Sequence, residues 1–390
     1  MTPALLALRA RLQAAGYAPE ALRQWLGAGV PDDVGPLNHA PALERVGTAP
    51  APVATAIRLF FLEADVPLAA ARRLLSPSLY TSLVANGLLR VRAGSVSTRL
   101  RIDPVGDQLF LADRRFRGPD RRALRLPVGD PVYPPSSDSF ILRDAVAALI
   151  GAMRTDLTVL DVCTGSGVQA LQAAGHAARL VCVDVSPRAA AVARSNAALN
   201  GVTQIEARVG DLYAPVRGKR FDLIIANPPF VTSPYDDGPA YHAGGPRGDR
   251  VLRRVLSRLA AHLRPGGRAA AISHVGLRAG ESVESVAPPW FRDFPGRALV
   301  LVLETGTAVD LAAAQAMFAL DRGLAAYAAE VRHWIAYLRR HRIDRVAVIV
   351  VVAAQDERRG LEVVDAAPRV LPIPLSPPLP QRVSDWLTAE

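Results

Sequence analysis

The sequence predicts an α/β protein whose sheet is covered by helices on both faces. In the second half of the chain, apolar runs of strand length alternate with helical patterns. These runs are continuous in Val, Ile and Leu rather than alternating with polar residues, as in strands that are buried on both faces. We expect seven strands, at residues 157–162, 179–184, 204–209, 221–226, 267–273, 298–304 and 345–353. We expect helices near residues 167–176, 187–200, 248–263, 309–319 and 322–341.

The composition indicates a folded, basic protein. At 390 residues the chain has room for two or three domains, and half of its residues are hydrophobic, so a sizeable core is available. The net charge of +10 favours an anionic partner, nucleic acid first. The bias of genome composition is an alternative explanation, because Lys219 is the only lysine and the chain is rich in Ala, Leu and Pro.

The cysteines and the apolar runs favour a cytoplasmic protein without a metal site. Cys163 and Cys182 both fall in predicted core segments and form no disulfide framework, which suits a reducing compartment. Cys and His residues show no metal-ligand spacing. The N-terminus does not resemble a signal peptide, and the apolar run at 346–354 is far too short to cross a bilayer. We therefore expect no membrane association.

The first part of the chain, residues 1–126, is expected to form a smaller, mostly helical domain. Two short helices at residues 3–28 precede a Pro- and Gly-rich stretch at 29–50, which we expect to be a loop. Three further helical patterns end near Leu89, and a β-hairpin pattern follows to Ala112. Helices followed by a hairpin are typical of winged-helix domains. The third helix carries no Arg or Lys, which disfavours reading of the major groove by that helix.

The hairpin and the residues after it are strongly basic. Between residues 90 and 125 ten arginines face four aspartates. Such a stripe can bind phosphates without reading sequence; a solvated linker that docks the next domain is the alternative. The ten arginines are Arg90, Arg92, Arg99, Arg101, Arg114, Arg115, Arg117, Arg121, Arg122 and Arg125.

Three motifs occur in order along the predicted sheet. The strand at 157–162 contains Asp161 and ends in a Gly-rich turn, after which a helix begins; this layout lets the backbone approach a nucleotide-like ligand closely. Asp184 ends the next apolar run, 23 residues after Asp161, where a carboxylate can accept both ribose hydroxyls. The strand at 221–226 runs into the third motif. The turn is Thr164, Gly165, Ser166 and Gly167, and the third motif is Asn227, Pro228, Pro229 and Phe230.

This ordered trio resembles the class I S-adenosylmethionine-dependent methyltransferases, in the branch with an Asn-Pro-Pro-aromatic motif that methylates nitrogen. The resemblance covers roughly residues 132–354 and implies a seven-stranded Rossmann-like domain at 127–365, followed by a Pro-rich tail at 366–390. It also implies S-adenosylmethionine as cofactor and an antiparallel last strand.

The resemblance assigns several residues to the cofactor. Asp161 would face its amino end, and Asp184 would hold the ribose. The backbone at Gly165 and Gly167, beside Thr164, would approach its methionine part. The segment at 132–140 is similar to one that lines the cofactor site in HemK-like methyltransferases. The matching positions there are Tyr133, Asp138 and Ser139, and Asp211 and Leu212 follow the third strand, where the family contacts adenine.

The Asn-Pro-Pro-Phe motif suits a nitrogen acceptor whose lone pair is delocalised. The side-chain carbonyl of Asn227 and the backbone carbonyl of Pro228 can accept both N–H groups of one NH₂, and Pro229 helps to fix that backbone. Phe230 can stack on a planar base or amide. Catalysis is then mostly positioning and electrostatics, without a dedicated base.

Two acceptor classes remain open. The first, which the charge and the winged-helix-like pattern favour, is an exocyclic amino group of DNA or RNA, most simply adenine N6. The alternative is a glutamine of a peptide-release factor, which the HemK-like segment and the loop at 232–248 favour. Tyr241 and His242 of that loop could touch either substrate. A binding module that keeps only the fold is a third possibility, which the intact Asn227 disfavours.

Overall fold

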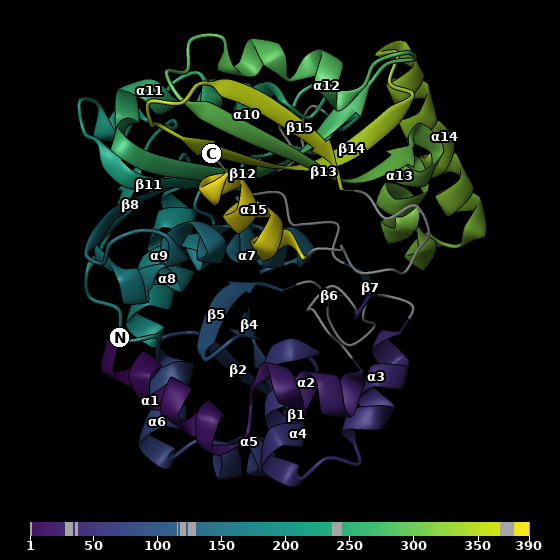
Figure 1. Cartoon of the computed structure of the whole chain (residues 1–390). Coiled ribbons are helices and arrows are strands. Elements are labelled where there is room, and N and C mark those ends of the chain that lie inside the picture. The colour runs from purple at the N-terminus through teal and green to yellow at the C-terminus, as the bar shows by residue number, and fades with distance from the viewer. Residues whose placement is uncertain are drawn as a thin grey trace. The chain divides into compact units, whose positions relative to one another are not determined.

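The computed structural model describes residues 2–27, 34–35, 38–114, 116–117, 122–123, 130–235, 244–366 and 378–389 (Figure 1). The chain divides into two compact units, each discontinuous in sequence. We call them the N-terminal unit and the sheet unit. The N-terminal unit comprises Met1–Ser137, Gly165–Val168 and Arg188–Thr203, and the sheet unit comprises Asp138–Thr164, Gln169–Pro187 and Gln204–Glu390.

The sheet unit is built on an eight-stranded mixed sheet of order β10-β9-β8-β11-β12-β14-β13-β15. The first five of these strands are parallel, and β14 runs antiparallel to both β12 and β13, as the resemblance implied. The prediction of seven strands missed β15, which pairs in parallel with β13 at the sheet edge. The strands are β8 (Leu157–Val162), β9 (Ala177–Asp184), β10 (Ile205–Val209), β11 (Phe221–Ala226), β12 (Leu263–Leu277), β13 (Arg297–Thr307), β14 (Arg345–Ala354) and β15 (Gly360–Asp365).

Helices lie on both sides of this sheet. In Figure 1, α10 lies on one side and α7 on the other. The tail that was expected to be only Pro-rich contains a helix, α15, whose Trp386 ring stacks 4.4 Å from the guanidinium of Arg297. The helices are α7 (Ser137–Gly151), α8 (Val168–Gln172), α10 (Arg250–Leu256), α11 (Leu259–His262), α12 (Val283–Val286), α13 (Ala308–Ala316), α14 (Leu324–Arg340) and α15 (Leu379–Thr388), with short 3₁₀ turns at Ala174–His176, Ala214–Val216, Pro288–Phe291 and Met317–Arg322.

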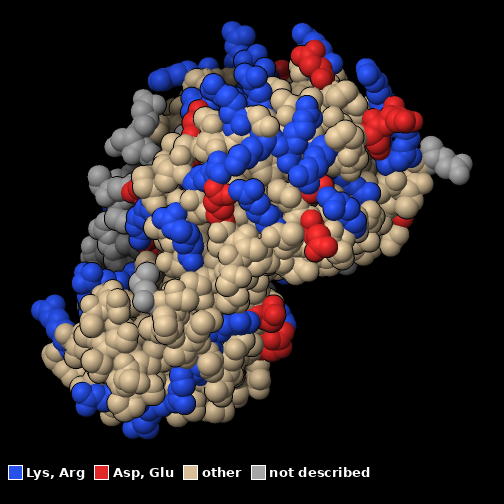
Figure 2. All heavy atoms as spheres, turned by 90° about the vertical axis from the view of Figure 1, so that its left-hand side faces the viewer, with Lys and Arg blue, Asp and Glu red and all other residues tan. Residues whose placement is uncertain are grey.

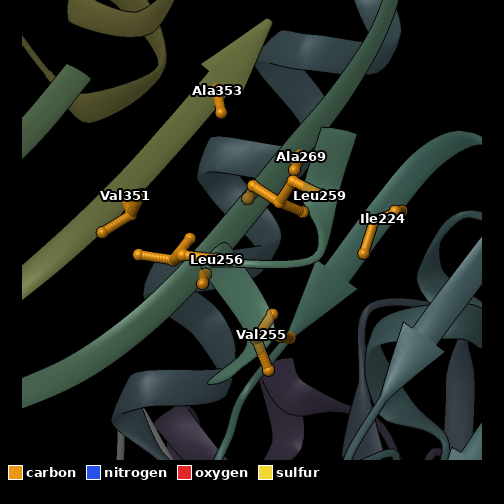
Figure 3. A pocket seen from close by; sticks show the side chains of 10 residues that line it. Ile224, Val255, Leu256, Leu259, Ala269, Val351 and Ala353 are labelled. Atoms are coloured by element: carbon orange, nitrogen blue, oxygen red, sulfur yellow. The ribbon is translucent and has the colours of Figure 1, made fainter. Parts of the chain in front are cut away.

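The core between β11, β12, β14 and the helices α10 and α11 is closely packed (Figure 3). Aliphatic side chains such as Ile224, Leu256 and Val351 converge on a gap that leaves no space for a water molecule. This part of the sheet unit therefore stabilises the fold and offers no ligand site.

The N-terminal unit is mostly helical. The sequence predicted a loop over residues 29–50, and a helix at His39–Val46 corrects this: Leu43 and Val46 are buried, and Pro41 stands in the first turn, which tolerates proline. The helices are α1 (Thr2–Ala14), α2 (Pro19–Leu26), α3 (His39–Val46), α4 (Ala51–Ala56) with a π-helical turn (Ile57–Phe61), α5 (Leu68–Leu74) and α6 (Pro77–Ala85). The strands are β1 (Val66–Pro67), β2 (Leu89–Arg92), β3 (Ser95–Thr98), β4 (Leu100–Val105), β5 (Gln108–Asp113), β6 (Phe116–Arg117) and β7 (Arg122–Ala123).

Helix α9 (Pro187–Leu199) belongs almost entirely to the N-terminal unit, where side-chain amides bind it to β5. The amide of Asn196 accepts from the backbone N–H of Leu111 at 2.7 Å and donates to its carbonyl at 2.9 Å. Asn200, just past the helix end, makes the same pair of bonds with Leu109. Asn196 and Asn200 are four residues apart, a rise of about 6 Å along a helix, and Leu109 and Leu111 are two residues apart, about 6.6 Å along a strand. The two amides can therefore reach both strand residues at once.

Arg90, Arg92 and Arg99 of the basic hairpin are exposed, but Arg101 is not. The side chain of Arg101 is fully buried, where its Nε donates to Asp103 at 2.6 Å and Glu63 lies 3.7 Å from its Nη1. Because β-strand side chains repeat every two residues, Asp103 stands on the same face and compensates the charge. Arg101 therefore cannot contribute to a phosphate-binding stripe. Of the other members, Arg115, Arg121 and Arg125 fall outside the described residues, as do the side chains of Arg117 and Arg122.

The buried charge cluster yields a stability prediction. Arg101→Met nearly keeps the volume but removes the buried cation beside Asp103 and leaves Glu63 with Arg114 alone, which we expect to destabilise the N-terminal unit by about 3–5 kcal/mol. Arg92→Met, at an exposed position of β2, is the control and should change little. Urea denaturation measures both; a loss below about 1 kcal/mol for Arg101→Met would show that the cluster is not a stabilising centre.

Candidate cofactor and acceptor site

Strand register brings the predicted motifs of the sheet unit to one edge of the sheet. Asp161 of β8 lies opposite Cys182 of β9 on one side and Ile225 of β11 on the other. Asp184, the last residue of β9, lies opposite Val209, the last residue of β10. Because these strands are parallel, their carboxyl ends share an edge, which is where open α/β sheets bind ligands.

Asp161 has an unusual environment for a carboxylate. It is 1% exposed, and its Oδ2 accepts from Thr164 Oγ1 at 2.6 Å and from the backbone N–H of Ala170 at 3.2 Å. Its Oδ1 is buried without a hydrogen-bond partner in the described part of the chain. Burial raises the pKa of Asp161 to about 7, against the effect of these two bonds. The site thus holds an acceptor atom that is unsatisfied within the described residues.

The turn after β8 has the backbone conformation that its glycines permit. Gly165 and Gly167 have φ of +52° and +81°, in the left-handed region that glycine adopts without strain. Cys163 also has a positive φ, of +61°, which is uncommon for a residue with a side chain. The backbone N–H of Thr164 donates to the carbonyl of Val183 at 3.1 Å, which ties the turn to β9. The helix that follows, α8, is only five residues long.

Three acidic side chains gather around the end of β8. The pKa of the Cys163 thiol is raised, first by burial and then by the negative charges of Asp184, Asp161 and Asp211. Asp184 is partly exposed and accepts from the backbone N–H of Ser186 at 2.9 Å. Asp211 is exposed and ion-paired with Arg254 at 2.5 Å. Leu212, beside it, is buried with a φ of +49°.

Asn227 directly follows β11, and its orientation is fixed by a contact that sequence reasoning did not foresee. Its Nδ2 donates to Oδ2 of Asp138 in the first turn of α7, at 2.7 Å and across 89 residues of sequence. With the NH₂ end directed at a carboxylate, the amide oxygen is the acceptor that remains. The resemblance places Asp138 in a segment that lines the cofactor site, and in the structure its carboxylate also accepts from Asn227.

Phe230 is supported from behind by His274 of β12. Their ring centroids are 4.2 Å apart, and burial lowers the pKa of His274 to about 4, so the imidazole is neutral at pH 7. The backbone also approaches closely: a Cβ on Gly244 or Gly248 would lie 2.5 Å from Phe230 backbone atoms. His274 was missed because the strand predicted at 267–273 ends one residue before it, whereas β12 continues to Leu277. Of the rest of the motif, Pro228 is buried and Pro229 partly exposed.

Four further residues are predicted to lie at the cofactor or the acceptor: Tyr133, Ser139, Tyr241 and His242. Tyr133 belongs to the N-terminal unit. Ser139 is buried in α7, where its backbone carbonyl accepts from Gln169 Nε2 at 2.9 Å. Tyr241 and His242 fall outside the described residues. Over the ranges that the structure describes, no group of three His, Cys, Asp or Glu side chains could hold a metal ion, and no helix is long and apolar enough to span a membrane.

The buried carboxyl of Asp161 predicts a pH-dependent stability. Because the pKa of Asp161 is raised in the folded state, the folded protein keeps a proton on this carboxyl at pH values where the unfolded chain has released it. The contribution of protonated Asp161 to the free energy of unfolding is therefore full below about pH 4 and is lost as pH rises to about 7. Asp161→Asn should remove this slope and be more stable than the parent above pH 7, by at most about 4 kcal/mol.

Denaturation between pH 5 and 8.5 measures this slope. The matched control is Asp211→Asn, since Asp211 is exposed. A stability difference between Asp161→Asn and the parent that stays constant over this pH range would contradict the assignment.

Comparison with known protein families finds two matches. Residues 142–286 match the family described as Methyltransferase small domain. Residues 14–99 match a Domain of unknown function (DUF7059). The first match contains the Gly-rich turn, Asp184, Asp211 and Asn227.

The curated relatives are methyltransferases. The release factor glutamine methyltransferase of Cereibacter sphaeroides is 35% identical over 203 residues, which is 43% of this chain and 72% of the relative. That of Mycolicibacterium smegmatis is 33% identical over 174 residues, 42% of this chain and 60% of the relative. The ribosomal protein uL3 glutamine methyltransferase of Bradyrhizobium diazoefficiens is 40% identical over 124 residues, 28% of this chain and 38% of the relative.

Several of these relatives are matched over only part of their length. The chain spans 60%, 51% and 57% of three release factor glutamine methyltransferases. The match to the relative from Cereibacter sphaeroides, by contrast, covers 72% of that protein. The sheet order and the match to the Methyltransferase small domain agree with this relationship to a methyltransferase. The chain belongs to the HemK-type class I methyltransferases, whose cofactor is S-adenosylmethionine.

Proposed function

We propose that this chain transfers a methyl group from S-adenosylmethionine to the side-chain amide nitrogen of a glutamine in a protein. The observation that carries the proposal is the Asn227–Asp138 hydrogen bond, which directs the Asn227 oxygen to accept from an NH₂ group. The relatives are named for glutamine methylation of release factors and of ribosomal protein uL3. The sequence alone ranked nucleic acid first, and the relatives favour its alternative instead.

The residues at the sheet edge suit the cofactor. The buried Oδ1 of Asp161, unsatisfied within the described residues, suits the ammonium of S-adenosylmethionine, whose positive charge would favour the ionised carboxylate. We assign Asp184 to the ribose hydroxyls and the backbone at Gly165 and Gly167 to the methionine carboxylate. Asp211 with Leu212 is assigned to the adenine, and Thr164, Tyr133 and Ser139 are assigned to the walls of the site.

The acceptor amide is activated by positioning. S-adenosylmethionine supplies, when bound, an electrophilic methyl group on a sulfonium. The Asn227 oxygen and the Pro228 carbonyl accept the two N–H groups of the glutamine amide and so orient its nitrogen. Asp138 keeps the Asn227 amide from turning over. Phe230, held by His274, offers its other face to the planar amide.

An exocyclic amino group of nucleic acid is the second candidate. Lys and Arg side chains predominate over Asp and Glu on the face shown in Figure 2, which supports attraction to a polyanion. The order α5, α6 and the β2–β3 hairpin supports a winged-helix-like reading of the N-terminal unit. The burial of Arg101 and the absence of Arg and Lys from α6 weaken it as a reader of DNA.

A side-by-side assay separates the two acceptors. The full chain is incubated with methyl-labelled S-adenosylmethionine and equal amounts of release factor, ribosomal protein, ribosomal RNA and duplex DNA. We expect label in a protein, as N-methylglutamine located by peptide mapping, because the site is assigned to a side-chain amide. Label only in nucleic acid would overturn the protein-acceptor proposal and support the second candidate.

Substitutions separate the acceptor group from the cofactor group. Asn227→Ala should lower kcat about 10²–10³-fold and leave cofactor affinity nearly unchanged. Asp138→Ala should lower kcat about tenfold or more, with partial recovery in Asp138→Asn, because only orientation is lost. Asp184→Ala should do the opposite and weaken cofactor binding about 10–100-fold.

Calorimetric titration of S-adenosylmethionine and single-turnover rates give the two readouts for these variants. Equal loss of cofactor affinity in Asn227→Ala and Asp184→Ala would mean that Asn227 is misassigned. A kcat for Asp138→Ala equal to that of the parent would remove Asp138 from the mechanism.

A further inference from the structure

The N-terminal unit contains a pocket of about 480 Å³ that the proposed function does not use. Its walls come from α1, α6, the strands β2 to β5 and α9, all within this one unit. The volume falls in the range of small-molecule sites, about 300–1,000 Å³. The side chains that line the pocket, arginines and aliphatic residues, indicate which class of ligand it can bind.

The polar part of the pocket is cationic. Four arginines line it, and no Asp or Glu lines it among the described residues. Two are neutralised nearby, because Arg114 donates to Glu63 and Arg188 to Asp113. The other two, Arg90 and Arg99, form no ion pair within the described ranges of the chain, which leaves an excess positive charge at the pocket.

The position of Arg99 is defined by its neighbours. Its backbone N–H donates to the carbonyl of Leu88 at 2.8 Å. Its guanidinium lies against Gly87, where an added Cβ would come within 3.6 Å of Nη1. A Cβ would meet the guanidinium there at an ordinary van der Waals distance, so it is the φ of +73° that favours glycine at this position.

The rest of the wall is aliphatic. Branched side chains from five elements and from the turn after α6 line it and contribute no polar atoms, and no aromatic ring lines it among the described residues. Such a surface favours a hydrocarbon body over a stacked base. The aliphatic residues are Leu5, Leu83, Leu88, Leu100, Leu111 and Val192.

We propose that this pocket binds an amphipathic small molecule, with an oxyanion head at Arg90 and Arg99 and an aliphatic body against the leucines. Guanidinium groups pair with phosphate and carboxylate alike, so the shared chemistry is an oxyanion on a hydrocarbon chain. Arg90 and Arg99 lie in the segment that matches a domain of unknown function, whereas the wall from α9 lies in the segment that matches the methyltransferase family. The ligand proposal does not rest on the methyl-transfer proposal.

Titration calorimetry on the full chain tests the site with n-octyl phosphate, octanoate and inorganic phosphate as separate probes. We expect octyl phosphate or octanoate to bind at least tenfold more tightly than inorganic phosphate, and the comparison of the two tells phosphate from carboxylate. The double variant Arg90→Gln/Arg99→Gln should weaken binding about tenfold or more. Arg92→Gln removes an exposed charge of the same strand that does not line the pocket, and it should bind as the parent does.

A second variant separates a pocket from a charged surface. Ser195 of α9 is partly exposed at the pocket wall, and Ser195→Phe fills the space while leaving every arginine in place. It should abolish octyl phosphate binding with an unchanged melting temperature and unchanged S-adenosylmethionine binding. Binding that survives Ser195→Phe, falls equally in Arg92→Gln, is no tighter than that of inorganic phosphate, or is absent from the parent would overturn the proposal.

Discussion

The parallel backbone ladder that joins β8 to β9 and β11 is the constraint on which the candidate site depends. It holds Asp161 opposite Ile225, so that Asn227 leaves β11 at the same edge where β8 turns. A slip of one residue would point the strand side chains to the opposite faces and take Asn227 out of reach of Asp138. The apolar core that packs against these strands therefore fixes their register, and the register holds Asn227 at the candidate site.

The elements that could be predicted from sequence are those whose own residues form a clear hydrophobic pattern. The strands β8, β9 and β11 were recognised because their sequences are continuous apolar runs. The edge strand β15 was missed because residues 360–365 mix Glu and Asp with apolar residues, and its pairing with β13 is a tertiary event. Helix α3 was missed for a similar reason, since its neighbours in sequence are Pro and Gly while its buried face is visible only after packing.

The candidate site divides in the same way. The Gly-rich turn, Asp184 and the Asn-Pro-Pro-Phe motif stand out because each motif is contiguous or lies at a strand end. The contacts that orient them come from distant segments: Asp138 on Asn227 and His274 on Phe230. The charge of Arg101 also gave a misleading signal, because a formal charge count does not tell an exposed arginine from one paired in the core.

The hydrogen bonds between the asparagines of the α9 segment and β5 limit how this protein can be cut into fragments that fold. Asn196 and Asn200 lie in the middle of the catalytic sequence, yet their amides complete the backbone hydrogen bonding of a strand near residue 110. No single cut therefore yields two self-sufficient fragments. A catalytic fragment that begins after residue 126 would carry two buried amides stripped of their partners and an uncovered Leu199. Poor solubility of such a truncation would reflect this shared helix rather than a fault in the active site.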